Sequence, residues 1–185
     1  MMNVAGIADR DQSQLVLIDM QTKLASVMPQ GIDAVIKNSA VLLQSAALLG
    51  VPSLHTEQYP KGLGPTLPEL SHYLNGKNPV EKTAFSCCGE PTFLRQLSRD
   101  HSQVILLGME AHICVLQTAL DLKAQGKTVF VVEDAVISRS PENKLNALNR
   151  LREAGVIITN TESLVFEWLA VAQGDAFKTI SQLIR

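Results

Sequence analysis

The sequence predicts an α/β fold with a mostly parallel central sheet. Short apolar segments of strand length alternate along the chain with longer segments whose apolar residues recur at helical spacing. Two of the strand-like segments, residues 104–107 and 129–132, are uniformly apolar, which is typical of strands buried on both faces. Strands that alternate with helices in this way usually form a parallel sheet covered by those helices.

In the N-terminal half, the first predicted strand covers residues 14–19 and ends in Asp19. A helix is predicted over 32–49, because its apolar residues recur at helical spacing and Gly50 supplies a C-terminal stop. The next strand is predicted over 51–56. The remaining elements of this half are a short helix over 67–74, a strand over 80–85 and a helix over 89–99.

In the C-terminal half, a strand over 103–108 leads through a short turn into a helix over 112–125, so that Cys114 lies near the start of a helix. The predicted elements after it are a strand over 128–134, a helix over 141–154, a strand over 156–159 and helices over 162–172 and 175–184. Ligands of parallel α/β sheets bind beyond the carboxyl ends of the strands. Asp19, Lys82 and the turn before Cys114 all lie at or near such ends, so we expect them to converge.

Length and composition favour one globular domain over residues 1–185, with 46% hydrophobic and 18% charged residues. The net charge of −2 gives no electrostatic reason to expect a nucleic acid or an anionic membrane as partner. No uninterrupted apolar run approaches the roughly 18 residues of a membrane span. The N-terminal residues do not resemble a signal peptide, and the three cysteines include no CxxC pair. We therefore expect a cytoplasmic protein without a disulfide framework.

Cys114, Asp19 and Lys82 form a candidate set for nucleophilic chemistry. A thiol near a helix start can have its pKa lowered and become nucleophilic. A carboxylate can accept its proton, and a lysine held in a cleft can stabilise the resulting charges. Each residue also has a simpler interpretation: a small buried hydrophobe for Cys114, a surface acid or helix cap for Asp19, and a solvated edge-strand residue for Lys82.

The other polar candidates carry weaker signals. His112 stands two residues before Cys114 and would face a different side of a helix, which favours a role in the pocket or in the structure over a role as base. His55, Glu57 and His72 do not have a recognised zinc spacing, so we expect no metal. No Walker A or dinucleotide-binding glycine pattern is present. The adjacent pair Cys87 and Cys88 is interpreted as packing or incidental.

Three segments together resemble the signature segments of the isochorismatase-like cysteine hydrolases. They are residues 15–21 (LVLIDMQ), 81–85 (EKTAF) and 108–115 (GMEAHICV), and they occur in the order found in that superfamily. The resemblance extends over roughly residues 13–172. It implies a Rossmann-like three-layer α/β/α sandwich around the parallel sheet, and hydrolysis of a small amide through a thioester.

The resemblance also implies roles for individual residues. The catalytic triad falls on Asp19, Lys82 and Cys114, with Asp19 deprotonating the thiol and later activating water. A cis peptide is implied between Met109 and Glu110. The backbone N–H groups of Glu110 and Cys114 would form the oxyanion hole, whose donors typically contribute about 3–4 kcal/mol each.

The segment after the second strand departs from nicotinamidases, whose metal-binding Asp-x-His pattern is missing from residues 55–64. The presence of Cys114 argues against the vinyl-ether chemistry of the named isochorismatases, which lack this residue. We therefore expect a metal-independent hydrolase of a small amide or related C–N bond, without a cofactor. Its small-molecule pocket is predicted to be lined by Gln21, Tyr59, Phe85 and His112.

Two rival functions stay open at this stage. One is an ether- or ester-cleaving hydrolase that uses the same pocket, and the other is a catalytically idle scaffold that binds a metabolite. The resemblance further implies a homo-oligomer. The apolar C-terminal residues 164–169 are a candidate interface, although packing within one subunit explains them equally well.

Overall fold

The computed structural model describes residues 6–74 and 76–184 and contains a six-stranded sheet with the order β3-β2-β1-β4-β5-β6. All neighbouring strands pair in parallel, which confirms the predicted parallel α/β fold. The strands are β1 (Ser13–Ile18), β2 (Ser53–Gln58), β3 (Val80–Lys82), β4 (Gln103–Met109), β5 (Thr128–Ile137) and β6 (Ile157–Thr159). β1 and β4 lie at the centre and are buried along their whole length, which agrees with the apolar runs 15–18 and 104–107 that they contain.

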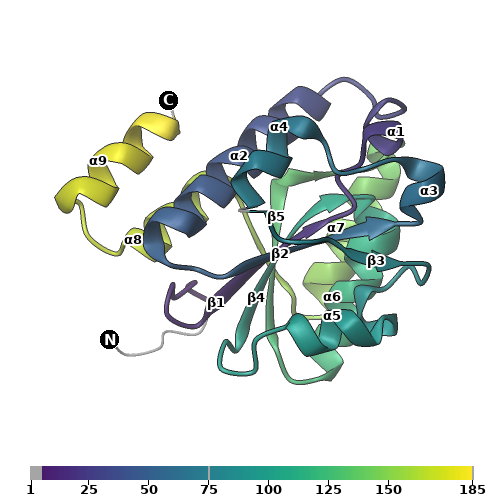
Figure 1. The fold of residues 1–185 in the computed structure, drawn as a ribbon. Helices are drawn as coiled ribbons and strands as arrows, with labels where there is room; N and C mark the ends of the chain where they lie inside the picture. Colours follow the sequence, from purple (N-terminus) through teal and green to yellow (C-terminus); the bar gives the residue numbers. More distant parts are fainter. Residues whose placement is uncertain (1–5, 75, 185) are drawn as a thin grey trace.

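Helices cover both faces of this sheet (Figure 1). On one face lie α2 (Ile32–Leu49), α4 (Pro68–Ser71), α8 (Thr161–Leu169) and α9 (Gly174–Leu183), which pack with the sheet into one hydrophobic cluster. On the other lie α5 (Pro91–Gln96), α6 (Leu116–Ala124) and α7 (Pro141–Glu153), which contribute to a second cluster. The short helices α1 (Thr22–Ala25) and α3 (Pro60–Leu63) belong to loops at the carboxyl ends of β1 and β2.

Local sequence signals account for most helix ends. Helix α2 ends at Gly50, whose left-handed backbone (φ 75°) allows its N–H to bond back to the last turn. Helices α7 and α8 begin at Ser140 and Asn160, whose side chains accept hydrogen bonds from the N–H groups of Asn143 and Ser163. These caps set the residue at which each helix starts, and therefore the residue at which the preceding loop ends.

Helix α2 is long and apolar enough, by length and composition, to cross a membrane. A single helix of this kind is weak evidence for a span, because core helices of soluble proteins satisfy the same criterion. Here α2 packs along the sheet and buries residues from Val35 to Ala46 in the first cluster. The structure therefore uses α2 as a core helix.

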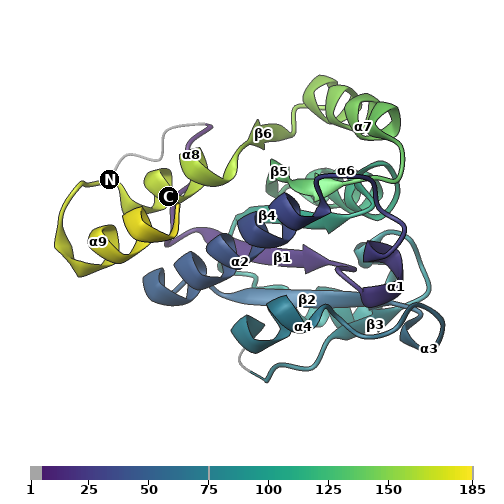
Figure 2. The ribbon, with the colours of Figure 1, turned by 90° about the horizontal axis from the view of Figure 1, so that it is seen from above.

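The C-terminal helices form an extension at one end of the molecule. Seen from above, α8 and α9 lie away from the loops that hold α1 and α3 (Figure 2). Trp168 of α8 donates a hydrogen bond from its indole Nε1 to Ser13 Oγ at 3.0 Å, and Glu167 accepts one from the N–H of Ala8 at 2.8 Å. These bonds attach the C-terminal helices to the start of β1, away from its carboxyl end.

Some element boundaries differ from the prediction. The predicted strand over 80–85 ends at Lys82, because the chain beyond it turns back toward the Lys82 amine. The predicted helix over 112–125 begins with a π-helical turn, Ala111–Val115, before α6. The predicted strand over 128–134 continues to Ile137 after a register irregularity against β4.

The strand order places a topological switch point at β1. From β1 the sheet grows through β2 and β3 on one side and through β4, β5 and β6 on the other. The loops that follow β1 and β4 therefore diverge at their carboxyl ends, which is where α/β proteins bind ligands. Asp19 follows β1 and Cys114 follows β4, so this geometry brings them to the same place.

Candidate active site

Asp19 and Lys82 form a buried ion pair. The Lys82 Nζ lies 2.7 Å from Asp19 Oδ2, and neither side chain has solvent-exposed surface. Asp19 follows directly on β1 and has a left-handed backbone (φ 50°), which is uncommon for a residue other than glycine. Lys82 is the last residue of β3, two strands away from β1. Two residues predicted from separate segments of the sequence therefore lie in contact. The simpler interpretation of each as a solvent-exposed residue is wrong.

Four oxygen atoms surround the Lys82 amine. Besides Asp19 Oδ2, they are Gln58 Oε1 at 2.6 Å and the carbonyl oxygens of Ala84 and Phe85 at 3.3 and 3.2 Å. Burial, the largest influence, acts to lower the pKa of Lys82, but the Asp19 carboxylate and the neighbouring thiols outweigh it and raise this pKa above its ordinary value. The lysine therefore stays charged inside the protein.

Gln58 was not predicted as a site residue. It lay outside the predicted strand 51–56, whereas the observed strand β2 runs to Gln58. Because side chains alternate along a strand, Gln58 points to the same face as Thr56, toward Lys82 and Asp19. A correct end for β2 would have been the signal that identifies Gln58.

Cys114 lies in the π-helical turn and is 7% exposed. Burial raises the pKa of its thiol to about 12, and the Asp19 carboxylate adds to this through its charge and a hydrogen bond, while Lys82 acts in the opposite direction. The position of Cys114 near a helix start predicted a lowered pKa, and the structure gives the opposite direction. Desolvation of the thiolate and the charge of the nearby Asp19 carboxylate outweigh the charge of Lys82, so the resting side chain is a neutral thiol.

The turn before Cys114 is fixed from two sides. The peptide bond between Met109 and Glu110 is cis. Gly108 has φ 118°, and a Cβ atom there would overlap the carbonyl oxygen of Ile18 in β1. The Glu110 carboxylate, 6% exposed, accepts hydrogen bonds from the backbone N–H of Arg139 at 2.9 Å and from its Nε at 3.1 Å. The loop after β5 thereby holds the turn in place.

His112 is bonded through both ring nitrogens. Its Nδ1 lies 2.9 Å from Ser138 Oγ, and its Nε2 lies 3.5 Å from the amide nitrogen of Asn143. Because the Asn143 amide nitrogen can only donate, Nε2 accepts and Nδ1 carries the hydrogen. This arrangement favours a role for His112 in ordering the turn rather than as a base for Cys114.

The remaining predicted pocket residues have different surroundings. Tyr59 and Phe85 are each 56% exposed, on the loops after β2 and β3. Gln21 is fully buried, and its side-chain amide bonds to the backbone of Gln58 and Gly64. Gln21 therefore anchors the loop that carries Tyr59, while the two aromatic rings are free to meet a ligand.

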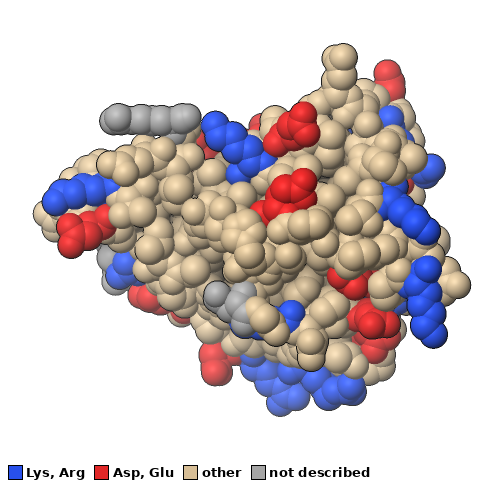
Figure 3. All heavy atoms as spheres, turned by 45° about the horizontal axis from the view of Figure 1, so that its top comes forward, with Lys and Arg blue, Asp and Glu red and all other residues tan. Residues whose placement is uncertain are grey.

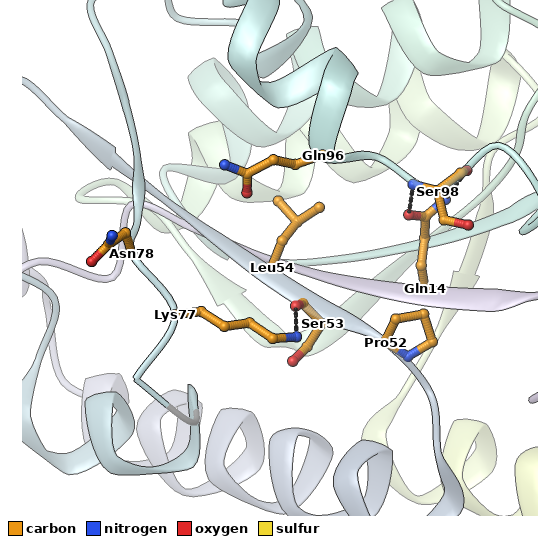
Figure 4. Close-up of a pocket in the computed structure, with 8 residues that line it drawn as sticks. All are labelled: Gln14, Pro52, Ser53, Leu54, Lys77, Asn78, Gln96 and Ser98. Atoms are coloured by element: carbon orange, nitrogen blue, oxygen red, sulfur yellow. Dashed lines mark hydrogen bonds between the residues drawn. The ribbon is translucent and has the colours of Figure 1, made fainter.

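Cavities lie at both ends of the sheet. One, of about 300 Å³, is lined by Tyr59, Lys82 and their neighbours at the carboxyl end of β2 and β3. The other, of about 260 Å³, is shown in Figure 4 and is lined by residues that include Gln14, Ser53 and Ser98. These last residues lie at the opposite end of the sheet, near the starts of β1 and β2, so the second cavity is remote from Asp19 and Lys82.

The residues considered as metal ligands do not form a site. Within residues 6–74 and 76–184, no group of three His, Cys, Asp or Glu side chains is placed to hold a metal ion. The Glu57 carboxylate instead accepts two hydrogen bonds from Thr66, through its N–H at 2.6 Å and its hydroxyl at 2.7 Å. Burial lowers the pKa of His55, which favours its neutral form.

Comparison with known proteins finds a family and several relatives for this chain. The model of the isochorismatase domain matches residues 13–163. Isochorismatase domain-containing protein 2 of Danio rerio is 43% identical over 174 residues, covering 93% of this chain and 86% of its own. The structure of MAR1 ribonuclease from Caenorhabditis elegans superposes with a TM-score of 0.90 at 38% identity, covering 96% of this chain and 92% of that one.

A more distant structure shares the fold. The YcaC protein of Escherichia coli, described as an octameric hydrolase of unknown specificity, has a TM-score of 0.88 at 22% identity and covers 96% of this chain and 90% of its own. The matched family segment contains β1, β3 and β4 with Asp19, Lys82 and Cys114. The chain therefore belongs to the isochorismatase family of hydrolases.

Proposed function

We propose that this protein hydrolyses a small amide or a related C–N bond through a thioester on Cys114. The observation that carries the proposal is the buried Asp19 carboxylate, which is paired with Lys82 at 2.7 Å and lies near enough to Cys114 for its charge to raise the pKa of that thiol. A nucleophile, a base and a fixed positive charge are thus present in one buried cluster. These are the components that acyl transfer through a thiol requires.

In the first half of the reaction, the Asp19 carboxylate takes the thiol proton as Cys114 Sγ attacks the substrate carbonyl carbon. The C–S bond forms and the carbonyl electron pair moves onto oxygen, where the backbone N–H groups of Glu110 and Cys114 are proposed to stabilise it. Collapse of this adduct breaks the C–N bond. The leaving amine takes the proton from Asp19, and a thioester remains on Cys114.

In the second half, Asp19 accepts a proton from water as the water oxygen attacks the thioester. The C–S bond then breaks, the acid is released, and the thiolate recovers its proton from Asp19. Lys82 transfers no proton in this scheme. Its raised pKa keeps it charged, and its charge offsets that of the Asp19 carboxylate, with which it is paired at 2.7 Å.

The neutral resting thiol fits this scheme. With its pKa raised to about 12, Cys114 is protonated at neutral pH, so proton transfer to Asp19 accompanies the attack. Such a thiol is protected from adventitious alkylation until a carbonyl carbon is bound beside it. The mechanism invokes no metal and no cofactor, and both absences stay predictions.

Tyr59, Phe85 and His112 are proposed to border the substrate, with Gln21 holding the loop of Tyr59 in place. The exposed aromatic rings suit a substrate with a planar or apolar part. Of the apolar residues proposed as an interface over 164–169, Leu164, Val165, Trp168 and Leu169 are buried within the subunit, and Phe166 is the one that is exposed. By analogy with the octameric YcaC protein, we also propose a homo-oligomer. The cytoplasmic location remains a prediction.

The name of the MAR1 neighbour raises RNA as an alternative substrate. On the face drawn in Figure 3, Lys and Arg side chains are interspersed with acidic and uncharged residues and do not form a continuous basic surface. The net charge of −2 also provides little attraction for a polyanion. These observations favour a small neutral substrate, and RNA serves as a comparison substrate in the test.

The decisive experiment combines a chromogenic ester with a panel of small primary amides and N-carbamoyl compounds. Rapid mixing with p-nitrophenyl acetate should release nitrophenolate, and mass spectrometry should locate the acetyl group on Cys114. At least one amide should then release ammonia continuously. Cys114→Ala should lose both activities, whereas the matched thiol control Cys88→Ala should keep them.

Four results would contradict the proposal. Acetylation of a residue other than Cys114 would show that Cys114 is not the nucleophile. Turnover of esters alone would favour the ester-cleaving rival, and cleavage of RNA by a Cys114-dependent route would favour the ribonuclease. No acetylation at all in a folded protein would support the idle scaffold.

A further inference from the structure

The Asp19 carboxylate is held at both oxygen atoms. Lys82 Nζ donates to Oδ2 at 2.7 Å, and the Thr56 hydroxyl donates to Oδ1 at 2.6 Å. Thr56 belongs to β2 and is 1% exposed. Its carbonyl oxygen also accepts the backbone N–H of Asp19 at 3.2 Å. Thr56 therefore fixes both the main chain and the side chain of Asp19.

The Thr56 hydroxyl has its own neighbour, Cys87. The Cys87 Sγ lies 4.0 Å from Thr56 Oγ1, within the range of a sulfur hydrogen bond, and Cys87 is fully buried. Because the hydroxyl gives its single hydrogen to Asp19, it can only accept from the thiol. Burial raises the pKa of Cys87 to about 12, so the thiol retains the hydrogen that it donates.

Cys87 is itself fixed in position. Its backbone N–H donates to Thr118 Oγ1 of α6 at 2.9 Å, and Thr118 is fully buried. The hydrogen bonds therefore run in one direction, from the Cys87 thiol to Thr56 and from Thr56 to Asp19. If Cys87 only filled space in an apolar core, the direction of its S–H bond would not matter. Here the direction matters, because the thiol donates to Thr56 and Thr56 donates to Asp19.

We propose that Thr56 is a positioning residue for the reaction and that Cys87 supports it as a second, non-nucleophilic thiol of the site. With Lys82 on one oxygen and Thr56 on the other, the carboxylate cannot rotate. Lone pairs of the carboxylate remain free to accept the Cys114 proton. The inference deepens the proposed function and rests on it, since it assigns Asp19 as the base.

Two readouts test the inference, and one of them needs no substrate. The first is the pH midpoint of iodoacetamide alkylation at Cys114, followed by peptide mapping. The second is the rate of acetylation by p-nitrophenyl acetate across the acidic pH range. Thr56→Val removes the hydroxyl with little change of volume, while Thr56→Ser retains it. Cys87→Ala and Cys87→Ser form the corresponding pair, and Cys88→Ala is the control for a thiol outside this chain of bonds.

Thr56→Val should slow acetylation by about tenfold, as expected when a charged group loses a buried hydrogen bond. It should move the acidic limb of the profile to higher pH, because the carboxylate form has lost a donor. It should also lower the alkylation midpoint of Cys114, since a rotating carboxylate bonds the thiol less well. Thr56→Ser should restore all three values, and Cys87→Ala should produce smaller changes that Cys87→Ser reverses.

The proposal is overturned if folded Thr56→Val matches the wild-type protein in both readouts, or if Thr56→Ser is as impaired as Thr56→Val. Folding is checked by urea unfolding of each variant. Should the wild-type protein take up no acetyl group, the proposed function fails. The alkylation midpoints of the Thr56 and Cys87 variants then still decide whether Thr56 positions Asp19.

Discussion

The Lys82 amine and the Asp19 carboxylate approach to 2.7 Å in a place that water does not reach. Such a pair gains little net stability from its formation, because both charges lose their hydration. Removing one partner has a much larger effect, since the other charge is left buried and unpaired. The pair therefore links the stability of the fold to the chemistry of the site.

Lys82→Met is expected to lower the free energy of unfolding by about 3–5 kcal/mol. Urea unfolding measures this loss. Adding Asp19→Asn to Lys82→Met should recover part of it, because the unpaired charge is gone. Lys178, whose exposed side chain pairs with Asp175, provides the control: Lys178→Met should leave the stability nearly unchanged. A double variant less stable than Lys82→Met would contradict the argument.

The contribution of Lys82 should depend on pH in one direction. Its pKa in the folded protein is raised above the ordinary 10.5, so the folded state binds the proton more tightly than the unfolded state. The stability difference between wild type and Lys82→Met should be fully present below that ordinary value of 10.5 and decline as the pH rises through the higher folded value. Urea unfolding in a pH series measures it, and a difference that grows at alkaline pH would refute the assignment.

Asp19→Asn should lower the pKa of Cys114. Burial is the main cause of its rise to about 12, and the charge and hydrogen bond of Asp19 add to it. Alkylation by iodoacetamide across alkaline pH, with peptide mapping, reports the midpoint. Cys88 provides an internal control, because burial and Asp121, rather than Asp19, raise its pKa to about 11. An unchanged Cys114 midpoint would show that the carboxylate does not act on the thiol.

The same Asp19→Asn variant should lose acyl transfer by about 10²–10⁴-fold, the usual contribution of a general base. The thiol should thus titrate more easily while the reaction becomes slower. Acetylation by p-nitrophenyl acetate measures the rate. An Asn variant that acetylates as fast as wild type would remove Asp19 from the mechanism.

Gly108→Ala should disrupt folding, because the new methyl group would overlap the Ile18 carbonyl oxygen at φ 118°. Gly126→Ala is the matched control, since Gly126 also has a positive φ (81°) but has open space around it. The control should lose only about 1–2 kcal/mol, the cost of a left-handed alanine. Thermal unfolding and soluble yield compare the two, and equal losses would mean that the contact with β1 is unimportant.

The sequence was sufficient for the order of the strands and the longer helices and for the meeting of Asp19 with Lys82, but not for the short helices α1 and α3. The helix over 32–49 was predicted at its observed bounds, because Gly50 combines a helix stop with a residue that tolerates a left-handed backbone. Asp19, Lys82 and Cys114 were placed at one edge of the sheet because parallel strands present their carboxyl ends on the same side.

Properties that arise from packing could not be predicted in this way. The strand predicted over 80–85 stops at Lys82, because a buried amine draws the Ala84 and Phe85 carbonyl groups toward it. The direction of the Cys114 pKa shift depends on the balance between burial and two opposite charges, which no local sequence pattern contains. Thr56 and Cys87 were missed because their importance lies in contacts between β2 and the loop after β3.

The crowded surroundings of Lys82 limit how the site can be inhibited. An ammonium group has three hydrogens, and four oxygen atoms already lie within 3.3 Å of this one. A carboxylate or phosphate inhibitor aimed at this amine would have to displace an existing partner and would meet the charge of Asp19. Uncharged electrophiles directed at the Cys114 sulfur avoid both penalties, and they are the better starting point for selective probes of this protein.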